Sequence, residues 1–170
     1  MKKVSFSSSQ FTQFTQAQQV AEWQRAKFYT KAYLDAMPED RFGFKPMPEI
    51  RSFAQQMLHL SDANYVLATA ASDKPNPIGE TLAVHNVNEK IVSPTKEAVT
   101  KAVMDSYDWV ITTLQNMTAD QLQETMKFGT RDLTRSGVYS RAFEHQTHTR
   151  GQTAIYLRLK GVTPPEEPLF

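Results

Sequence analysis

The residues best suited to chemistry in this chain are its four histidines, His59, His85, His145 and His148. Neutral imidazole is a good ligand for zinc, nickel, copper and iron, and a site with three protein ligands keeps one coordination position open for water or substrate. His145 and His148 are three residues apart, so on a helix they would share one face and permit joint ligation. Since the chain has no cysteine, any metal would have to use histidine, carboxylate, hydroxyl or water ligands.

Each histidine also has a plainer interpretation. His59 lies next to an apolar stripe, where a lone histidine is commonly a hydrogen-bonded structural residue. The spacing of His145 and His148 also arises by chance on helices that bind nothing. His85 lies in an irregular segment, so we expect it to be exposed to solvent unless its loop folds over the mouth of the bundle.

Other catalytic patterns are missing from the sequence. Di-iron carboxylate bundles carry Glu-x-x-His on two helices, and zinc peptidases carry His-Glu-x-x-His, whereas the order here is Glu144-His145-Gln-Thr-His148. There is no glycine-rich phosphate loop and no nucleophile elbow. The 19 basic and 18 acidic residues are scattered and give a formal charge of +1, which does not predict a nucleic-acid surface. Hydrolysis by a serine or threonine stays open, although no specific residue stands out.

Amphipathic segments with proline between them must position these histidines. The first predicted helix runs from about Ala17 to Met37. The second begins at Pro48-Glu49, where proline suits the first helical turn, and continues to about Ala71. His59 therefore lies on the second predicted helix.

The second half of the chain gives two further long helices. Ser93-Pro94 predicts the start of the third, and Thr118-Ala-Asp-Gln121 predicts a capping box that opens a short helix. We expect a loop from Lys127 to Arg135, and then a fourth helix from Gly137 to about Leu159 with Ser136 as its N-cap. His145 and His148 lie on this fourth helix, which Gly161 ends.

Four helices of roughly 20 residues with connections of unequal length predict an all-α four-helix bundle with a long crossover. The length of 170 residues suits one domain over residues 1–170, and we expect residues 1–14 to be poorly ordered. Neither a signal-peptide core nor an apolar run of about 18 residues is present, so we expect a cytoplasmic protein that does not cross a membrane. In such a bundle His59 and His145 would meet across the interior.

Several segments in both halves of the chain carry a family resemblance when taken together. They are Pro38-Glu-Asp-Arg-Phe-Gly-Phe-Lys-Pro46, Pro48-Glu-Ile-Arg-Ser52, Met57-Leu-His59-Leu, Glu144-His-Gln-Thr-His-Thr-Arg-Gly-Gln152, Ile155-Tyr-Leu-Arg-Leu-Lys-Gly161 and Pro164-Pro165. With these segments the chain resembles the DinB/YfiT-like family, whose members are regarded as metalloenzymes. The resemblance implies an up-down-down-up bundle, often dimeric, that binds a divalent metal through one histidine of the second helix and two of the fourth.

By position, the resemblance assigns His59 and His145 as the first two metal ligands. The family's third ligand stands four residues after the first one on the fourth helix, where this chain has Thr149. At about 100° per residue, Thr149 lies roughly 40° round the helix from His145, and His148 roughly 60° round in the other direction. Three outcomes stay open: His148 turns in to ligate, Thr149 and a water fill the gap, or the site has lost its affinity for metal.

Arg150 and Gln152 belong to the same motif. Their functional interpretation is support of the ligating imidazoles or contact with a substrate anion. The plainer alternatives are a solvated Arg150 and a structural hydrogen bond from Gln152.

The resemblance also implies what the site would do. It implies zinc or nickel, with iron or manganese as alternatives, and a small-molecule substrate. Some relatives are thiol transferases that use bacillithiol or mycothiol, and a bound metal would lower the pKa of such a thiol. A hydrolase that uses metal-bound water is a variant of this function, and the alternative is a non-catalytic stress-associated or small-molecule-binding protein with a degenerate site. We also expect a homodimer, with Phe42 and Phe44 at its interface unless they pack on their own bundle.

Overall fold

The computed structural model describes residues 15–79, 87–90 and 94–168 of the chain. Long helices form most of this part: α1 (Gln16–Ala36), α2 (Phe53–Ser72), α3 (Lys96–Gln115) and α5 (Arg135–Leu159). The shorter elements are η1 (Glu39–Arg41), η2 (Asn88–Lys90), α4 (Ala119–Gln123), β1 (Thr125–Phe128) and β2 (Arg131–Thr134). Residues 1–14, where poor order was predicted, and His85 lie outside the described residues.

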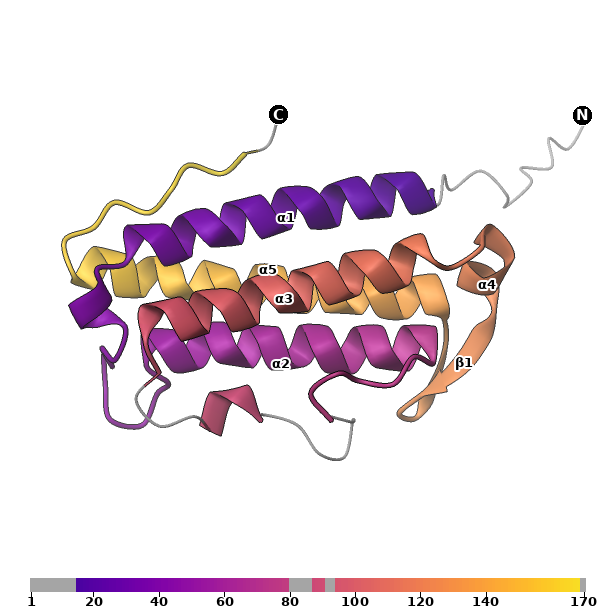
Figure 1. Cartoon of the computed structure of the whole chain (residues 1–170), viewed down its shortest axis with the longest axis horizontal. Coiled ribbons are helices and arrows are strands. Elements are labelled where there is room, and N and C mark those ends of the chain that lie inside the picture. Colours follow the sequence, from indigo (N-terminus) through magenta and orange to yellow (C-terminus); the bar gives the residue numbers. More distant parts are fainter. Residues whose placement is uncertain (1–14, 80–86, 91–93, 169–170) are drawn as a thin grey trace, which may run out of the picture.

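The long helices form the predicted bundle with up-down-down-up topology (Figure 1). α1 and α5 run in one direction, and α2 and α3 run in the other. Because α2 and α3 are parallel, the connection between them has to return along the whole length of the bundle, and η2 lies on this crossover. Around the bundle, α1 and α2 each pack against both α3 and α5.

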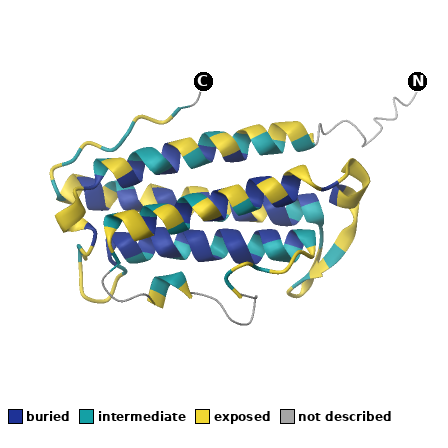
Figure 2. Cartoon of the chain, in the orientation of Figure 1, coloured by how far each residue is buried: buried dark blue, intermediate teal, exposed yellow. Residues whose placement is uncertain are grey.

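The helix α2 is buried along most of its length, because α3, α5 and η2 all pack against it (Figure 2). Its buried side chains are not all apolar, since Asp62 and Asn64 are each 1% exposed. Such polar groups require partners inside the protein. The amide nitrogen of Asn64 donates to the hydroxyl of Ser106 on α3 at 3.2 Å.

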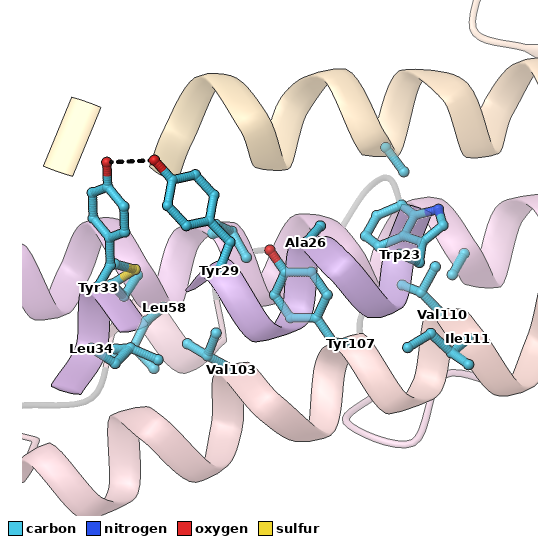
Figure 3. Close-up of a cluster of buried hydrophobic side chains, with 14 of the residues drawn as sticks. Trp23, Ala26, Tyr29, Tyr33, Leu34, Leu58, Val103, Tyr107, Val110 and Ile111 are labelled. Carbon is cyan, nitrogen blue, oxygen red and sulfur yellow. Dashed lines mark hydrogen bonds between the residues drawn. The ribbon is translucent and has the colours of Figure 1, made fainter. Parts of the chain in front are cut away.

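Aromatic residues fill the core between α1 and α3 (Figure 3). Trp23 packs edge-on against Tyr107, with ring centroids 5.8 Å apart. Tyr29 and Tyr33 pack edge-on one turn apart, and their hydroxyls are 3.3 Å apart. No helix in the described part of the chain is long and apolar enough to cross a membrane.

The starts of three helices differ from the prediction. α2 begins at Phe53 and not at Pro48-Glu49, because Ser52 and Gln55 form a capping box in which each side chain bonds to the other's backbone amide. α5 begins at Arg135, and its N-cap is Thr134, not Ser136. α3 also begins slightly later than predicted, at Lys96, with Thr95 as its N-cap.

The predicted loop from Lys127 to Arg135 is wrong, because strands β1 and β2 form an antiparallel hairpin there. Gly129 lies at its turn with a φ of 60°, a left-handed conformation that glycine adopts without strain. The hairpin leads directly into α5, whose N-cap Thr134 is the last residue of β2.

Phe42 and Phe44 both pack on their own bundle, which is one of the two alternatives left open by the sequence. Phe42 is 2% exposed and contacts Phe53 edge-on at 5.1 Å. Phe44 is half-buried, and the ammonium group of Lys160 lies 3.5 Å from the centre of its ring. Both rings therefore contribute to the packing of their own bundle.

Candidate metal centre

His59 and His145 lie side by side at the seam between α2 and α5. Their ring centroids are 5.2 Å apart and their planes are inclined by 61°. Both side chains are partly buried. The packing of α2 against α5 thus brings together the two histidines that the family resemblance assigned as the first two ligands.

The surroundings of His145 favour its neutral form. Burial lowers its pKa to about 4, and electrostatic interactions with His59, His148 and Arg51 act in the same direction. Its Nδ1 atom is buried and has no hydrogen-bond partner among the described residues. A buried nitrogen of this kind is satisfied by a bound cation or by water, and neutral imidazole is the form that binds metal.

His59 contacts a carboxylate that comes from the crossover. Its Nδ1 lies 3.2 Å from Oε2 of Glu89 on η2. Arg51, just before α2, donates to both oxygens of the same carboxylate, with Nε 2.6 Å from Oε1 and Nη2 3.2 Å from Oε2. Glu89 is therefore shared between a guanidinium group and the imidazole of His59.

Asp62 holds the backbone that carries Glu89. Its carboxylate lies one turn after His59 on α2 and accepts the backbone amides of Asn88 at 3.2 Å and of Glu89 at 3.0 Å. Burial raises the pKa of Asp62 above its ordinary value, while these hydrogen bonds oppose the shift. The first residues of η2 are thereby fixed to α2.

His148 is exposed on α5 and is engaged by another side chain. The Nε2 atoms of His148 and Gln152 are 3.0 Å apart, and the amide oxygen of Gln152 accepts a hydrogen bond from Gln56 on α2. The structural hydrogen bond that the sequence suggested for Gln152 is therefore present.

Thr149 and Arg150 point into the bundle. Thr149, in the position of the family's third ligand, is 1% exposed. The Arg150 guanidinium lies 4.5 Å from the centre of the Tyr29 ring and donates to Oε1 of Gln146 at 2.7 Å. The interpretation of Arg150 as a solvated residue is wrong, because it is 5% exposed. None of its described hydrogen bonds goes to His59 or His145.

The structure places close together two of the three side chains that the family resemblance assigned as ligands. Nowhere in residues 15–79, 87–90 and 94–168 do three histidine, aspartate or glutamate side chains come close enough together to hold a metal ion. The imidazoles of His59 and His145 fit a divalent transition metal in kind, and the unpartnered Nδ1 of His145 favours one. Water or a substrate atom would have to occupy the remaining positions.

A groove of about 690 Å³ opens beside the histidine pair, and we call it the α2–α5 groove. It is lined by Pro46, Glu49, Ile50, Arg51, Gln56, Glu89, Gln152, Ile155 and Tyr156. Glu89 links the groove to the pair, since it lines the groove and contacts His59. Its size lies within the range of small-molecule sites.

Sequence reasoning missed Glu89, Arg51 and Asp62. Glu89 belongs to the crossover, where no helical period indicates which way a side chain points. Asp62 stood in a predicted helix three residues after His59, and this spacing places the two on neighbouring positions of one face. Asp62 is the single carboxylate of this helix, and that was the available signal, because buried carboxylates need partners.

A helical bundle with this topology is shared with several solved structures. A DinB-like protein from Bacillus cereus ATCC 10987 aligns with a TM-score of 0.75 at 18% identity, over 88% of this chain and 95% of that one. A DinB-like protein from Bacillus subtilis aligns with a TM-score of 0.68 at 17% identity, over 88% of this chain and 96% of that one. A conserved protein from Enterococcus faecalis aligns with a TM-score of 0.66 at 17% identity, over 87% of this chain and 98% of that one. At these identities the likeness concerns the fold alone.

The sequence itself determines the family. The pattern of the DinB superfamily matches residues 22–153, which include both His59 and His145, so the chain belongs to the DinB superfamily. None of the curated proteins matches the chain in sequence.

Proposed function

We propose that this protein is a divalent-metal-dependent enzyme that holds its metal with His59 and His145 and acts on a small molecule in the α2–α5 groove. The observation that carries the proposal is the juxtaposition of two imidazoles from different helices, with ring centroids 5.2 Å apart. Nδ1 of His145 is buried and has no hydrogen-bond partner in the described part of the chain. A histidine pair that served packing alone would bury its nitrogens against hydrogen-bond partners.

Thiol transfer is the reaction that we favour, with zinc or nickel as the metal. The bound metal would supply a lowered thiol pKa, so that the thiol loses its proton to solvent near neutral pH. The sulfur would then form a bond to an electrophilic carbon, and the leaving group would depart with its electron pair. Hydrolysis of the same kind of substrate by water is the variant within this class.

The α2–α5 groove would bind and orient the substrate. Ile50 and Ile155 offer exposed apolar surface, at 41% and 55% exposure, for the apolar part of a small electrophile. Gln56 and Gln152 present amides that can hydrogen-bond a neutral polar group. Since Arg51 is already paired with Glu89, the groove has little free positive charge for an anionic substrate.

The second candidate function is a non-catalytic small-molecule-binding protein with a degenerate site. Thr149 favours it, because the family's third ligand is absent at that position. In that case the groove would bind its ligand without metal. A homodimer and a cytoplasmic location stay predictions under either function.

The experiment is a metal titration of untagged protein. We expect about one Zn²⁺ or Ni²⁺ per chain after desalting, and loss of retention in His59→Ala and in His145→Ala. His148→Ala serves as the third variant, and retained metal in it would show that water or substrate fills the third position. Wild-type protein without retained metal would instead favour the binding protein. Thiol-transfer assays with small electrophiles follow if metal is retained.

A further inference from the structure

The carboxylate of Glu89 is held from two sides at the metal centre. Arg51 donates to both of its oxygens, at 2.6 and 3.2 Å, and Nδ1 of His59 lies 3.2 Å from Oε2. The Glu89 side chain is 16% exposed, so most of it is shielded from solvent. A surface ion pair with Arg51 alone would not require an imidazole at this distance.

The backbone of Glu89 is held from a third direction. Asp62, 1% exposed on α2, accepts the amides of Asn88 and Glu89. Because His59 and Asp62 lie one turn apart on α2, the helix fixes both the imidazole and the segment that carries the carboxylate. A buried carboxylate is costly to retain, and this one holds the backbone of two residues of η2.

We propose that Glu89 is a positioning residue that selects the ligating nitrogen of His59, and that Asp62 keeps Glu89 in place. A carboxylate facing Nδ1 stabilises the tautomer with its proton on Nδ1, so Nε2 carries the lone pair that binds metal. Arg51 holds both carboxylate oxygens, which keeps Glu89 in this role and away from the metal position. The inference rests on the proposed function, since a tautomer matters to a metal only if His59 ligates one.

The first test measures the tautomer without metal. The ¹⁵N shifts of the His59 imidazole in metal-free protein at pH 8 should show the proton on Nδ1. Glu89→Ala should give a mixture of tautomers, and Glu89→Gln should restore part of the preference, because its amide oxygen still accepts a hydrogen bond. Glu124→Ala is the matched control, since Glu124 also pairs with an arginine, Arg135, but at the hairpin end of the bundle and away from His59.

The second test measures affinity for Co²⁺ or Zn²⁺ in the same variants. We expect Glu89→Ala to weaken binding by about 10- to 100-fold, as is typical when an outer carboxylate of a ligating histidine is removed. Asp62→Asn should weaken it in the same direction, with circular dichroism used to confirm that the bundle is folded. Glu124→Ala should bind as wild type does.

The two proposals fail differently. If wild-type protein binds no metal, the metal-dependent function fails, whatever the ¹⁵N shifts show. If wild-type protein binds metal and Glu89→Ala binds it equally well, or keeps the wild-type tautomer, the positioning role of Glu89 is overturned while the metal-dependent function stands.

Discussion

The side-chain nitrogen of Gln152 lies 3.0 Å from Nε2 of His148, one turn back on α5. Because the amide oxygen of Gln152 accepts from Gln56, its nitrogen is the donor to His148, whose Nε2 is then the acceptor. His148 could ligate through Nε2 only by giving up this hydrogen bond. Thr149, the buried residue one turn after His145, is therefore the position at which a third ligand could be added without breaking this hydrogen bond.

Thr149→His should restore a three-histidine site. The new imidazole would stand four residues after His145, on the inward face of α5. We expect affinity for Zn²⁺ or Ni²⁺ to rise by at least about tenfold, equivalent to about 1.4 kcal/mol. The measurement is calorimetric titration of the metal-free protein. Since Thr149 is fully packed, the larger ring can cost about 1–3 kcal/mol of stability, which thermal unfolding would record.

Thr147→His is the matched control for that substitution. It adds the same imidazole to the same helix two residues earlier, on the exposed face. Its affinity should equal that of wild type. An equal gain from both substitutions would indicate binding by surface histidines and would contradict the assigned third position.

The metal-free protein should lose stability in mild acid through His145. Its pKa falls from 6.5 in the unfolded chain to about 4 in the folded one. Between these values the unfolded chain binds a proton that the folded chain does not, so the free energy of unfolding decreases as pH falls from about 6.5 to about 4. Above that window His145 has no such effect. Because the His145 ring is only partly buried, the decrease should stay below the roughly 3 kcal/mol that a shift of this size implies.

Urea unfolding of wild type and His145→Asn between pH 4 and pH 8 isolates this contribution. Asparagine is neutral at every pH in this range. As pH falls, the unfolding free energy of wild type should therefore decrease more than that of His145→Asn. A difference that stays constant across the range would show that His145 does not have the lowered pKa.

Arg150 should contribute to the stability of the core and not to metal binding. Its guanidinium stacks on Tyr29, and it shares the Gln146 amide oxygen with the hydroxyl of Tyr107. Arg150→Lys keeps the charge but loses the planar group, so we expect a loss of about 2 kcal/mol in unfolding free energy. Arg158→Lys, at an exposed position of the same helix, should change stability little. Metal affinity of Arg150→Lys should stay within about twofold of wild type if the protein remains folded.

Two glycines should respond to alanine in opposite directions. Gly151 is exposed within α5, and an added Cβ would meet nothing within 4 Å, so Gly151→Ala should stabilise the protein by about 0.5–1 kcal/mol. Gly129 has a φ of 60° in the hairpin turn, so Gly129→Ala should cost about 1 kcal/mol. Thermal unfolding midpoints test both, and shifts of equal sign would be inconsistent with these backbone conformations.

The sequence predicted the four long helices well, because their apolar period is strong and proline separates them. It was less informative at their ends. Pro48 resembled a first-turn proline, yet Ser52 and Gln55 form a capping box that starts α2 at Phe53. In the hairpin, Gly129 marked a turn, but four residues per strand were too few to distinguish from a loop.

The residues of the candidate site were also only partly predictable from the sequence. His59 and His145 were predictable, because helix periodicity and the family motif place them on facing helices. Glu89 was not, since its position depends on hydrogen bonds to Asp62 that only the folded crossover makes. Arg150 was placed near the site by its motif, whereas the structure buries it against Tyr29 on the other side of α5 from the groove residue Gln152.

The attachment of η2 to α2 gives one side of the candidate site a lower local stability than the core. The helices that carry His59 and His145 are held by the whole core. In contrast, η2 is held by two hydrogen bonds from its backbone amides to Asp62 and by the contacts of Glu89. Segments with so few buried contacts open at a lower free energy than the core, without global unfolding. The amide protons of Asn88 and Glu89 should then exchange with solvent sooner than those at the middle of α2. The folded bundle would thus alternate between a state in which the Glu89 carboxylate contacts His59 and a state in which it does not.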